Sequence, residues 1–391
     1  MTSKTRLTVL LVSTPIIAFG LLGGFLDRVL AGQDTTYQHL RVFEEVVSLV
    51  MSNYVEPVRN ERIMRGALQG LAEGLDADSA WLTPAQVAVL SRAQAPAKGT
   101  IGLELTRQYY LRVIAARDGS PAAKAGLATG DYIRAINGAP TREMSVWAGQ
   151  QALGGAPGSK VTLTVLRGNA AEPHEVTLVR DEAPPATVTG RLVRPGVGLI
   201  RVAAFTERTA SELRQQAIAL RKQGAGHLVV DLRRTAEGVP SLGFASARLF
   251  VATGTLGARE GRTVPKQVTA TTSGDGIITL PVTVLTDNGT SQAAEVFAAA
   301  LKGNARATLI GERTLGRAAS QELVTLPDGS GLWLSTARFL APDGSSIHEK
   351  GLTPDTVVAE PDLEFGATSG ATDPILDKAL ELLPATAAPA A

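Results

Sequence analysis

Short apolar segments alternate with amphipathic ones from Thr187 onward, and this alternation constrains the fold more than any other feature of the chain. The apolar segments predict buried strands at Gly196–Val202, His227–Leu232, Val282–Thr286 and Ala307–Ile310. The segments between them predict helices at Thr209–Lys222, Ser241–Val251 and Gln292–Leu301. Strands that are apolar along their whole length need cover on both faces. We therefore predict an α/β fold in which a mixed sheet lies between helices.

Length and composition narrow the class of protein further. The chain has 391 residues, enough for two or three domains with a sizeable core. Its net charge of +1 and the lack of a basic segment with interleaved aromatics predict no nucleic-acid partner. It contains no cysteine, and its four histidines are scattered without ligand spacing. We therefore predict no metal site and no cofactor.

The N-terminus has the features of an export signal. Lys4 and Arg6 precede a charge-free, mostly apolar stretch from Leu7 to Leu26, which is about long enough to span a bilayer. We expect residues 1–33 to form an uncleaved signal anchor, with a cleaved signal peptide as the alternative. Positive charge before the span predicts that the bulk of the chain is translocated. The expected location is the bacterial inner membrane, single-pass, with the bulk in the periplasm.

Residues 35–95 have a helical pattern. Leu40, Phe43, Val47 and Val50 recur at three- and four-residue spacing. A second helix is expected from about Glu61 to Leu75. Residues 384–391 are rich in Ala and Pro, and we expect a disordered tail there.

Residues 98–183 resemble a bacterial PDZ domain. The resemblance rests on several separately spaced motifs: Gly99-Thr100-Ile101-Gly102-Leu103, Gly119-Ser120-Pro121-Ala122, Gly130-Asp131-Tyr132-Ile133 and the alternating Lys160–Arg167. PDZ domains add an extended peptide to a sheet edge and hold its terminal carboxylate with loop N–H groups. These donors would be Ile101, Gly102 and Leu103, and the partners would be polypeptide C-termini. The alternative is a rigid spacer that binds no peptide.

Two further motifs resemble the catalytic core of the carboxyl-terminal processing (tail-specific) serine proteases. They are the segments 284–295 and 311–321, set against the family patterns G-S-A-S-A-S-E and G-E-x-T-x-G-K-x-x-x-Q. The family's nucleophilic Ser falls on Gln292, its base Lys on Arg317, and its Gln on Gln321. Gln292 and Arg317 lie 25 residues apart, which is the family's own spacing. The resemblance implies a ClpP/crotonase-like core over residues 187–365.

Both replacements remove the chemistry of a Ser/Lys dyad. A carboxamide has no ionisable nucleophilic atom, and a guanidinium stays protonated in proteins. The base of such a dyad must instead be able to accept a proton. The resemblance therefore implies a member of the family that is catalytically degenerate.

The predicted oxyanion loop, formed by Glu237, Gly238 and Ala293, departs from the family as well. A glycine of the motif D-L-R-x-N-x-G-G is Glu237 here, and a carboxylate opposes the charge that an oxyanion hole stabilises. Three other acids, Asp231, Glu295 and Glu312, lie at strand ends or helix starts and are expected to cap backbone groups.

These observations predict a membrane-anchored, non-catalytic scaffold or regulator that binds peptides through its PDZ domain. It could be the inactive partner of an active paralogous protease. The first alternative is an active serine endopeptidase that cleaves C-terminal regions of proteins with a displaced nucleophile, Ser291. The second is a structural envelope protein with an empty groove.

Overall fold

The computed structural model describes residues 37–92, 99–168, 172–182, 187–361 and 373–383. The chain divides into two compact units, with the boundary between Gly70 and Leu71. The predicted anchor, residues 1–33, and the predicted tail, residues 384–391, lie outside the described residues. Within the described ranges no helix is both long and apolar enough to cross a bilayer.

The first unit is helical, as its periodicity predicts. A helix occupies residues 37–53, and α2 (Asn60–Glu73) begins in this unit and ends in the next. The apolar side chains of Leu40 and Val46 are each at least half exposed. The segment that follows also contains a strand: β1 (Ala80–Leu82) precedes α3 (Pro84–Ser91) and pairs with β18 (Gly331–Leu340).

The second unit contains a six-stranded mixed sheet, as predicted. Its strands, in spatial order, are β10 (Val188–Arg194), β11 (Val197–Val202), β12 (His227–Asp231), β15 (Val282–Thr286), β16 (Ala307–Gly311) and β19 (Thr356–Val357). The pair β10–β11 is antiparallel, and every other pair in this sheet is parallel. The continuous apolar runs of β11, β12 and β15 explain their central positions, since both of their faces are buried.

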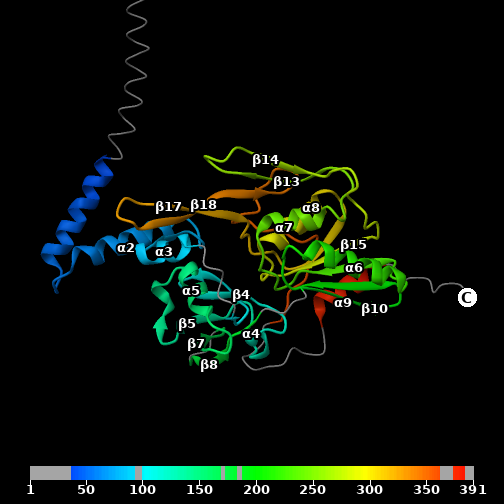
Figure 1. Ribbon diagram of the computed structural model, residues 1–391, viewed down its shortest axis with the longest axis horizontal. Helices are drawn as coiled ribbons and strands as arrows, with labels where there is room; N and C mark the ends of the chain where they lie inside the picture. The colour runs from blue at the N-terminus through cyan, green and yellow to red at the C-terminus, as the bar shows by residue number, and fades with distance from the viewer. Residues whose placement is uncertain (1–36, 93–98, 169–171, 183–186, 362–372, 384–391) are drawn as a thin grey trace, which may run out of the picture. The chain divides into compact units, whose positions relative to one another are not determined.

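Helices cover both faces of this sheet (Figure 1). On one face lie α6 (Thr209–Lys222), α7 (Pro240–Ala247) and α8 (Ala293–Gly303), which share one core cluster with the strands. On the other face lies α9 (Pro374–Leu382), which packs with Leu199, Val229 and Leu285. The predicted helix Ser241–Val251 is shorter than expected, because turns with mixed i→i+3 and i→i+4 bonds replace the regular helix after Ala247.

A second, antiparallel sheet lies beside the first and was not predicted. It contains β13 (Thr255–Glu260), β14 (Gln267–Ala270), β17 (Ala319–Thr325) and β18 (Gly331–Leu340), together with β1. The PDZ-like region forms a third sheet, in the order β3 (Leu103–Gln108), β4 (Tyr110–Ala116), β5 (Tyr132–Ile136), β7 (Lys160–Leu166) and β8 (His174–Val179). Its short elements are β2 (Gly99–Thr100), α4 (Pro121–Lys124), β6 (Ala139–Pro140), a 3₁₀ turn (Thr141–Glu143), α5 (Val146–Leu153) and β9 (Asp181–Glu182).

The packing of α7 against α8 depends on Gly243. A Cβ atom at this position would lie 3.0 Å from the backbone N of Phe297 and still closer to the carbonyl oxygen of Ala293. We expect Gly243→Ala to lower the free energy of unfolding by about 1–3 kcal/mol, the usual cost of overpacking a core. Urea denaturation followed by circular dichroism measures the change.

Gly226→Ala is the matched control for this prediction. A Cβ atom on Gly226 would meet nothing closer than 3.9 Å, so its effect should stay within about 0.5 kcal/mol. If Gly243→Ala is as mild as this control, then close approach of the two helices is not what fixes their position.

Candidate functional site

Three loops meet at the carboxyl edge of the central sheet. They follow β12, β15 and β16, which are adjacent and parallel, so their carboxyl ends lie side by side. The first loop carries Glu237 and Gly238, the second ends in Ser291 and Gln292, and the third carries Arg317. The topology therefore brings residues that are far apart in the sequence to one edge.

Gln292 occupies a sharp turn between a strand and a helix. It is the N-cap of α8 and adopts φ 54° and ψ −117°, a region that side-chain-bearing residues rarely visit. A nucleophile is presented on such a strained strand-to-helix turn in other hydrolases. The described structure thus has the backbone of a nucleophile elbow with a carboxamide on it.

The buried carboxylate of Glu295 joins this turn to the loop of Arg317. Glu295 has no exposed surface, and its oxygens accept bonds from the backbone N–H groups of Gln292 (3.1 Å), Gly316 (2.6 Å) and Arg317 (2.8 Å). The hydroxyl of Thr314 donates to the same carboxylate. Burial raises the pKa of Glu295 to about 7, although these four donors favour the charged form. The expected backbone-capping role of Glu295 is confirmed.

The side chain of Arg317 is held by acidic and carbonyl groups. Its Nε donates to Asp78 Oδ2 (2.8 Å), its Nη2 lies 2.6 Å from Asp78 Oδ1, and its Nη1 donates to the carbonyl oxygen of Leu105 (3.1 Å). Glu104 lies 3.9 Å from the same Nη1. Burial alone would lower the pKa of Arg317, but Asp78, Glu104 and Glu295 together outweigh it and hold that pKa above its ordinary value. The group at the base position therefore cannot accept a proton.

The remaining predicted residues are engaged elsewhere or buried. Gln321 lies on β17 and donates to the hydroxyl of Ser335 (3.2 Å) on β18. Ser291 is 1% exposed, and its hydroxyl has no hydrogen-bond partner among the described residues. The amine of Lys302, the nearest lysine after the turn, binds Asp355 at 2.8 Å. No described lysine or histidine makes a contact with Ser291 that would activate it.

The predicted oxyanion loop is fixed by a close backbone approach. Gly238 has φ 125°, and a side chain there would collide with the backbone of Phe205, so glycine is required. Ala293 is fully buried as the first residue of α8. Glu237 projects instead toward the PDZ-like region, where its Oε2 accepts a bond from Arg117 at 2.6 Å. The carboxylate is thus paired with a cation and remains partly exposed.

The loop expected to bind peptide carboxylates precedes β3. Gly102 adopts φ 73°, and a Cβ there would collide with Ser120. The N–H of Gly102 donates to the hydroxyl of Thr100 (3.0 Å), and its carbonyl oxygen accepts from the N–H of Arg117 (2.8 Å). Ile101 is fully buried and Leu103 is 3% exposed, so only their backbones can face a ligand.

The PDZ-like region packs directly on the three loops. Ile114 and Ala115 of β4 form an apolar cluster with Ala236 and Leu315. A second ion pair joins Asp118 of the PDZ-like region to Arg201 of β11 at 2.7 Å. The partners of Glu237 and Arg317 were not foreseen from the sequence, because no local pattern indicates contacts across more than 100 residues.

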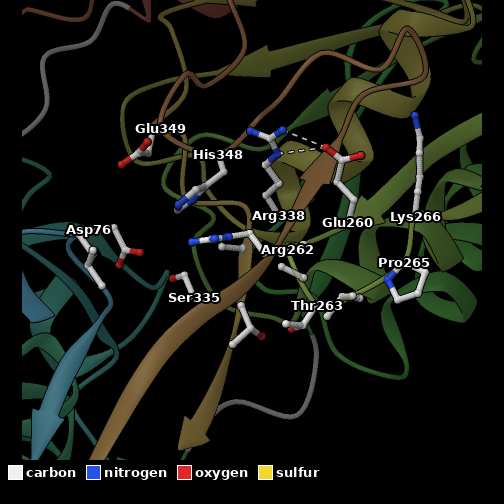
Figure 2. Close-up of a pocket in the computed structure, with 16 residues that line it drawn as sticks. Asp76, Glu260, Arg262, Thr263, Pro265, Lys266, Ser335, Arg338, His348 and Glu349 are labelled. Atoms are coloured by element: carbon white, nitrogen blue, oxygen red, sulfur yellow. Dashed lines mark hydrogen bonds and ion pairs between the residues drawn. The ribbon is translucent and has the colours of Figure 1, made fainter. Parts of the chain in front are cut away.

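A cavity of about 700 Å³ is lined by residues of β13 and β18 and by His348 and Glu349, and no predicted site residue lines it. Figure 2 shows Arg262, His348 and Ser335 around it, with the ion pair of Arg338 and Glu260 (2.9 Å) in its wall. One link to the site is the bond from Glu349 N–H to the carbonyl oxygen of Gly316. Among the residues described here, no cluster of three or more His, Asp or Glu side chains is placed to hold a metal ion.

Comparison with known proteins agrees with this geometry. Residues 196–358 match the model of peptidase family S41, and residues 112–167 match a PDZ domain. The chain is 32% identical over 362 residues to a carboxyl-terminal-processing protease of Synechocystis sp., covering 90% of this chain and 83% of that protein. It is 29% identical over 337 residues to a carboxy-terminal-processing protease of Bartonella bacilliformis, covering 84% and 77%.

A solved structure of similar fold is that of a photosystem II D1 C-terminal processing protease. The TM-score is 0.67 at 28% identity, over 79% of this chain and 85% of that one. The chain therefore belongs to the carboxyl-terminal processing proteases of peptidase family S41 and contains a PDZ domain. The predicted family and the predicted mixed α/β fold are confirmed.

The Glu295 carboxylate should be the main stabiliser of the three loops. Glu295→Ala leaves three backbone N–H groups and one hydroxyl buried without a partner, and each such group costs about 1–3 kcal/mol. We expect a loss of about 3 kcal/mol or more in the free energy of unfolding, measured by urea denaturation. Glu322→Ala, which removes a half-exposed carboxylate 3.4 Å from Arg259, should cost less than about 1 kcal/mol. Equal losses in the two variants would contradict the role given to Glu295.

Proposed function

We propose that this chain is a membrane-anchored member of the family that binds polypeptide C-termini through its PDZ domain and does not cleave them. The observation that carries the proposal is the pair of replacements at the elbow and base positions. Gln292 stands on the nucleophile-type turn without an ionisable atom, and the guanidinium of Arg317 is bound to Asp78. Neither can take part in a Ser/Lys mechanism.

The contacts of Ser291 weigh against a displaced nucleophile. A substrate carbonyl must reach the attacking oxygen, but Ser291 is 1% exposed and its backbone N–H is bonded to the carbonyl oxygen of Thr235 at 3.0 Å. A serine hydroxyl also needs an adjacent base, and the amine of Lys302 is bound to Asp355. These contacts support a non-catalytic protein over an active endopeptidase that uses Ser291.

The oxyanion loop supports the same proposal. The glycine of the family motif is replaced by Glu237, whose carboxylate adds negative charge where an active enzyme must stabilise it. Its ion pair with Arg117 offsets that charge but also holds the PDZ domain against the loop.

The cellular setting of the proposal rests on the sequence. The charges of Lys4 and Arg6 before an apolar stretch support a single-pass anchor in the bacterial inner membrane with the bulk in the periplasm. A protein that binds C-termini there without cutting them could present polypeptides to an active paralogous protease, or withhold them from it. A C-terminal phosphatase reporter, active only outside the cytoplasm, tests the orientation; an inactive fusion would contradict it.

The degeneracy can be tested by restoring the missing groups in turn. The wild-type chain should not cleave an unstructured polypeptide ending in apolar residues above the level of its Ser291→Ala variant. Gln292→Ser with Arg317→Lys should give weak turnover. Adding Glu237→Gly should raise the rate further, by up to about 100-fold, because it removes a carboxylate that opposes the oxyanion and lets the loop direct a backbone donor worth about that much. Initial rates of cleavage, measured by gel and mass spectrometry, decide each step.

Two results would count against this account. Wild-type turnover that is abolished by Ser291→Ala would establish a displaced nucleophile. A double variant as fast as an active relative would show that Glu237 does not impair the oxyanion loop.

A further inference from the structure

The peptide groove of the PDZ domain and the oxyanion loop enclose one cavity. Its volume is about 340 Å³, and residues of both regions line it. Gly102, Leu103 and Glu104 line it from the carboxylate-binding loop and β3, and Gln150 from α5. Ala236 and Glu237 line it from the core. A peptide that enters the groove therefore meets the oxyanion loop as well.

Two arginines in this cavity have unused donors. The side chain of Arg117 is 9% exposed, and its Nε is buried without a hydrogen-bond partner among the described residues. The Nε of Arg234 is also buried without a hydrogen-bond partner among the described residues, and both arginines line the cavity. A buried donor without a partner costs about 1–3 kcal/mol, so such atoms indicate a ligand that the cavity is built to receive.

Arg117 is placed beside the carboxylate-binding loop. Its backbone N–H donates to the carbonyl oxygen of Gly102 at 2.8 Å, so its position is fixed relative to that loop. A guanidinium matches a carboxylate best through two parallel bonds. Glu237 accepts one hydrogen bond from Arg117, from Nη1 to Oε2, and leaves the Nε of Arg117 unpaired.

Glu237 is the exchangeable member of this pair. Its side chain is 40% exposed, against 9% for Arg117, and exposed ion pairs contribute little. The pair also links the PDZ domain to the core, because Arg117 belongs to the first and Glu237 to the second. Arg317 forms a separate link through the carbonyl oxygen of Leu105 on β3.

We propose that Arg117 receives the C-terminal carboxylate of a bound peptide and that Glu237 occupies this place until the peptide displaces it. This inference rests on the proposed function and deepens it. Peptide binding then exchanges an internal carboxylate for an external one and breaks a link between the PDZ domain and the oxyanion loop. The residue that replaces the oxyanion glycine thus becomes an internal competitor of the ligand.

The experiment is isothermal titration of the full-length chain in detergent micelles. The probes are a short peptide ending in Leu-Ala-Ala with a free carboxylate and the same peptide with an amidated terminus. In the wild-type chain the free acid should bind about ten-fold tighter than the amide. Glu237→Gln should tighten binding of the free acid by about five- to ten-fold and leave the amide unchanged, because only the carboxylate competes for Arg117.

Variants at Arg117 test the receptor itself. Arg117→Met should reduce the affinity for the free acid to that for the amide. The swap Arg117→Glu with Glu237→Arg keeps an ion pair between the two regions but should abolish the preference for the free acid. Glu207→Gln, which neutralises an exposed acid outside the cavity, is the control and should change neither affinity. Thermal unfolding of each variant verifies that it is folded.

The outcomes separate this inference from the function on which it rests. A wild-type preference for the free acid that Glu237→Gln leaves unchanged overturns the inference and preserves peptide binding. Equal tightening of both probes by Glu237→Gln also overturns it, since Glu237 would then be a steric block. If no variant binds either probe, the proposed function and the inference both fail.

Discussion

The buried carboxylate of Glu295 is the interaction on which the rest of the site depends. It binds the backbone of Gln292 on one loop and the backbones of Gly316 and Arg317 on another. These bonds involve main-chain groups, so they are indifferent to the side chains at the elbow and base positions. The geometry of the site is therefore maintained with Gln292 at the elbow and Arg317 on the neighbouring loop.

Under the proposed function, this independence explains how the chain keeps the family's fold without a Ser/Lys mechanism. The turn at Gln292 retains an unfavourable backbone conformation, which costs on the order of 1–3 kcal/mol and which the bonds to Glu295 help to hold. At the base position, a guanidinium finds stronger partners than an amine would, because its planar donors reach Asp78 and the carbonyl oxygen of Leu105 together. Arg317 and Glu237 thus serve as contacts between regions of the protein.

The central sheet could be predicted from the sequence because its strands are short and continuously apolar. The predicted bounds of Thr209–Lys222 and Val282–Thr286 match α6 and β15. The antiparallel sheet could not be predicted in the same way. Most residues of β17 are at least partly exposed, and such a strand lacks the continuous apolar run that identifies β15.

The site could be predicted only as far as local motifs reach. The spacing of Gln292 and Arg317 placed both on neighbouring loops, and the bonds to Glu295 show why that spacing matters. The sequence could not indicate that Arg317 binds Asp78, which is 239 positions away, or that Glu237 binds Arg117. The first contact arises where the segment before β1 packs on the core, and the second where the PDZ domain does. No periodicity or motif encodes either of them.

The central claim is that the elbow carries no nucleophile. Labelling of the full-length chain with a fluorophosphonate, a reagent that reacts covalently with activated serines, tests it most directly by intact-mass spectrometry. We expect no mass increase for this chain, under conditions in which the Synechocystis relative is labelled. A stoichiometric adduct that maps to Ser291 would contradict the account.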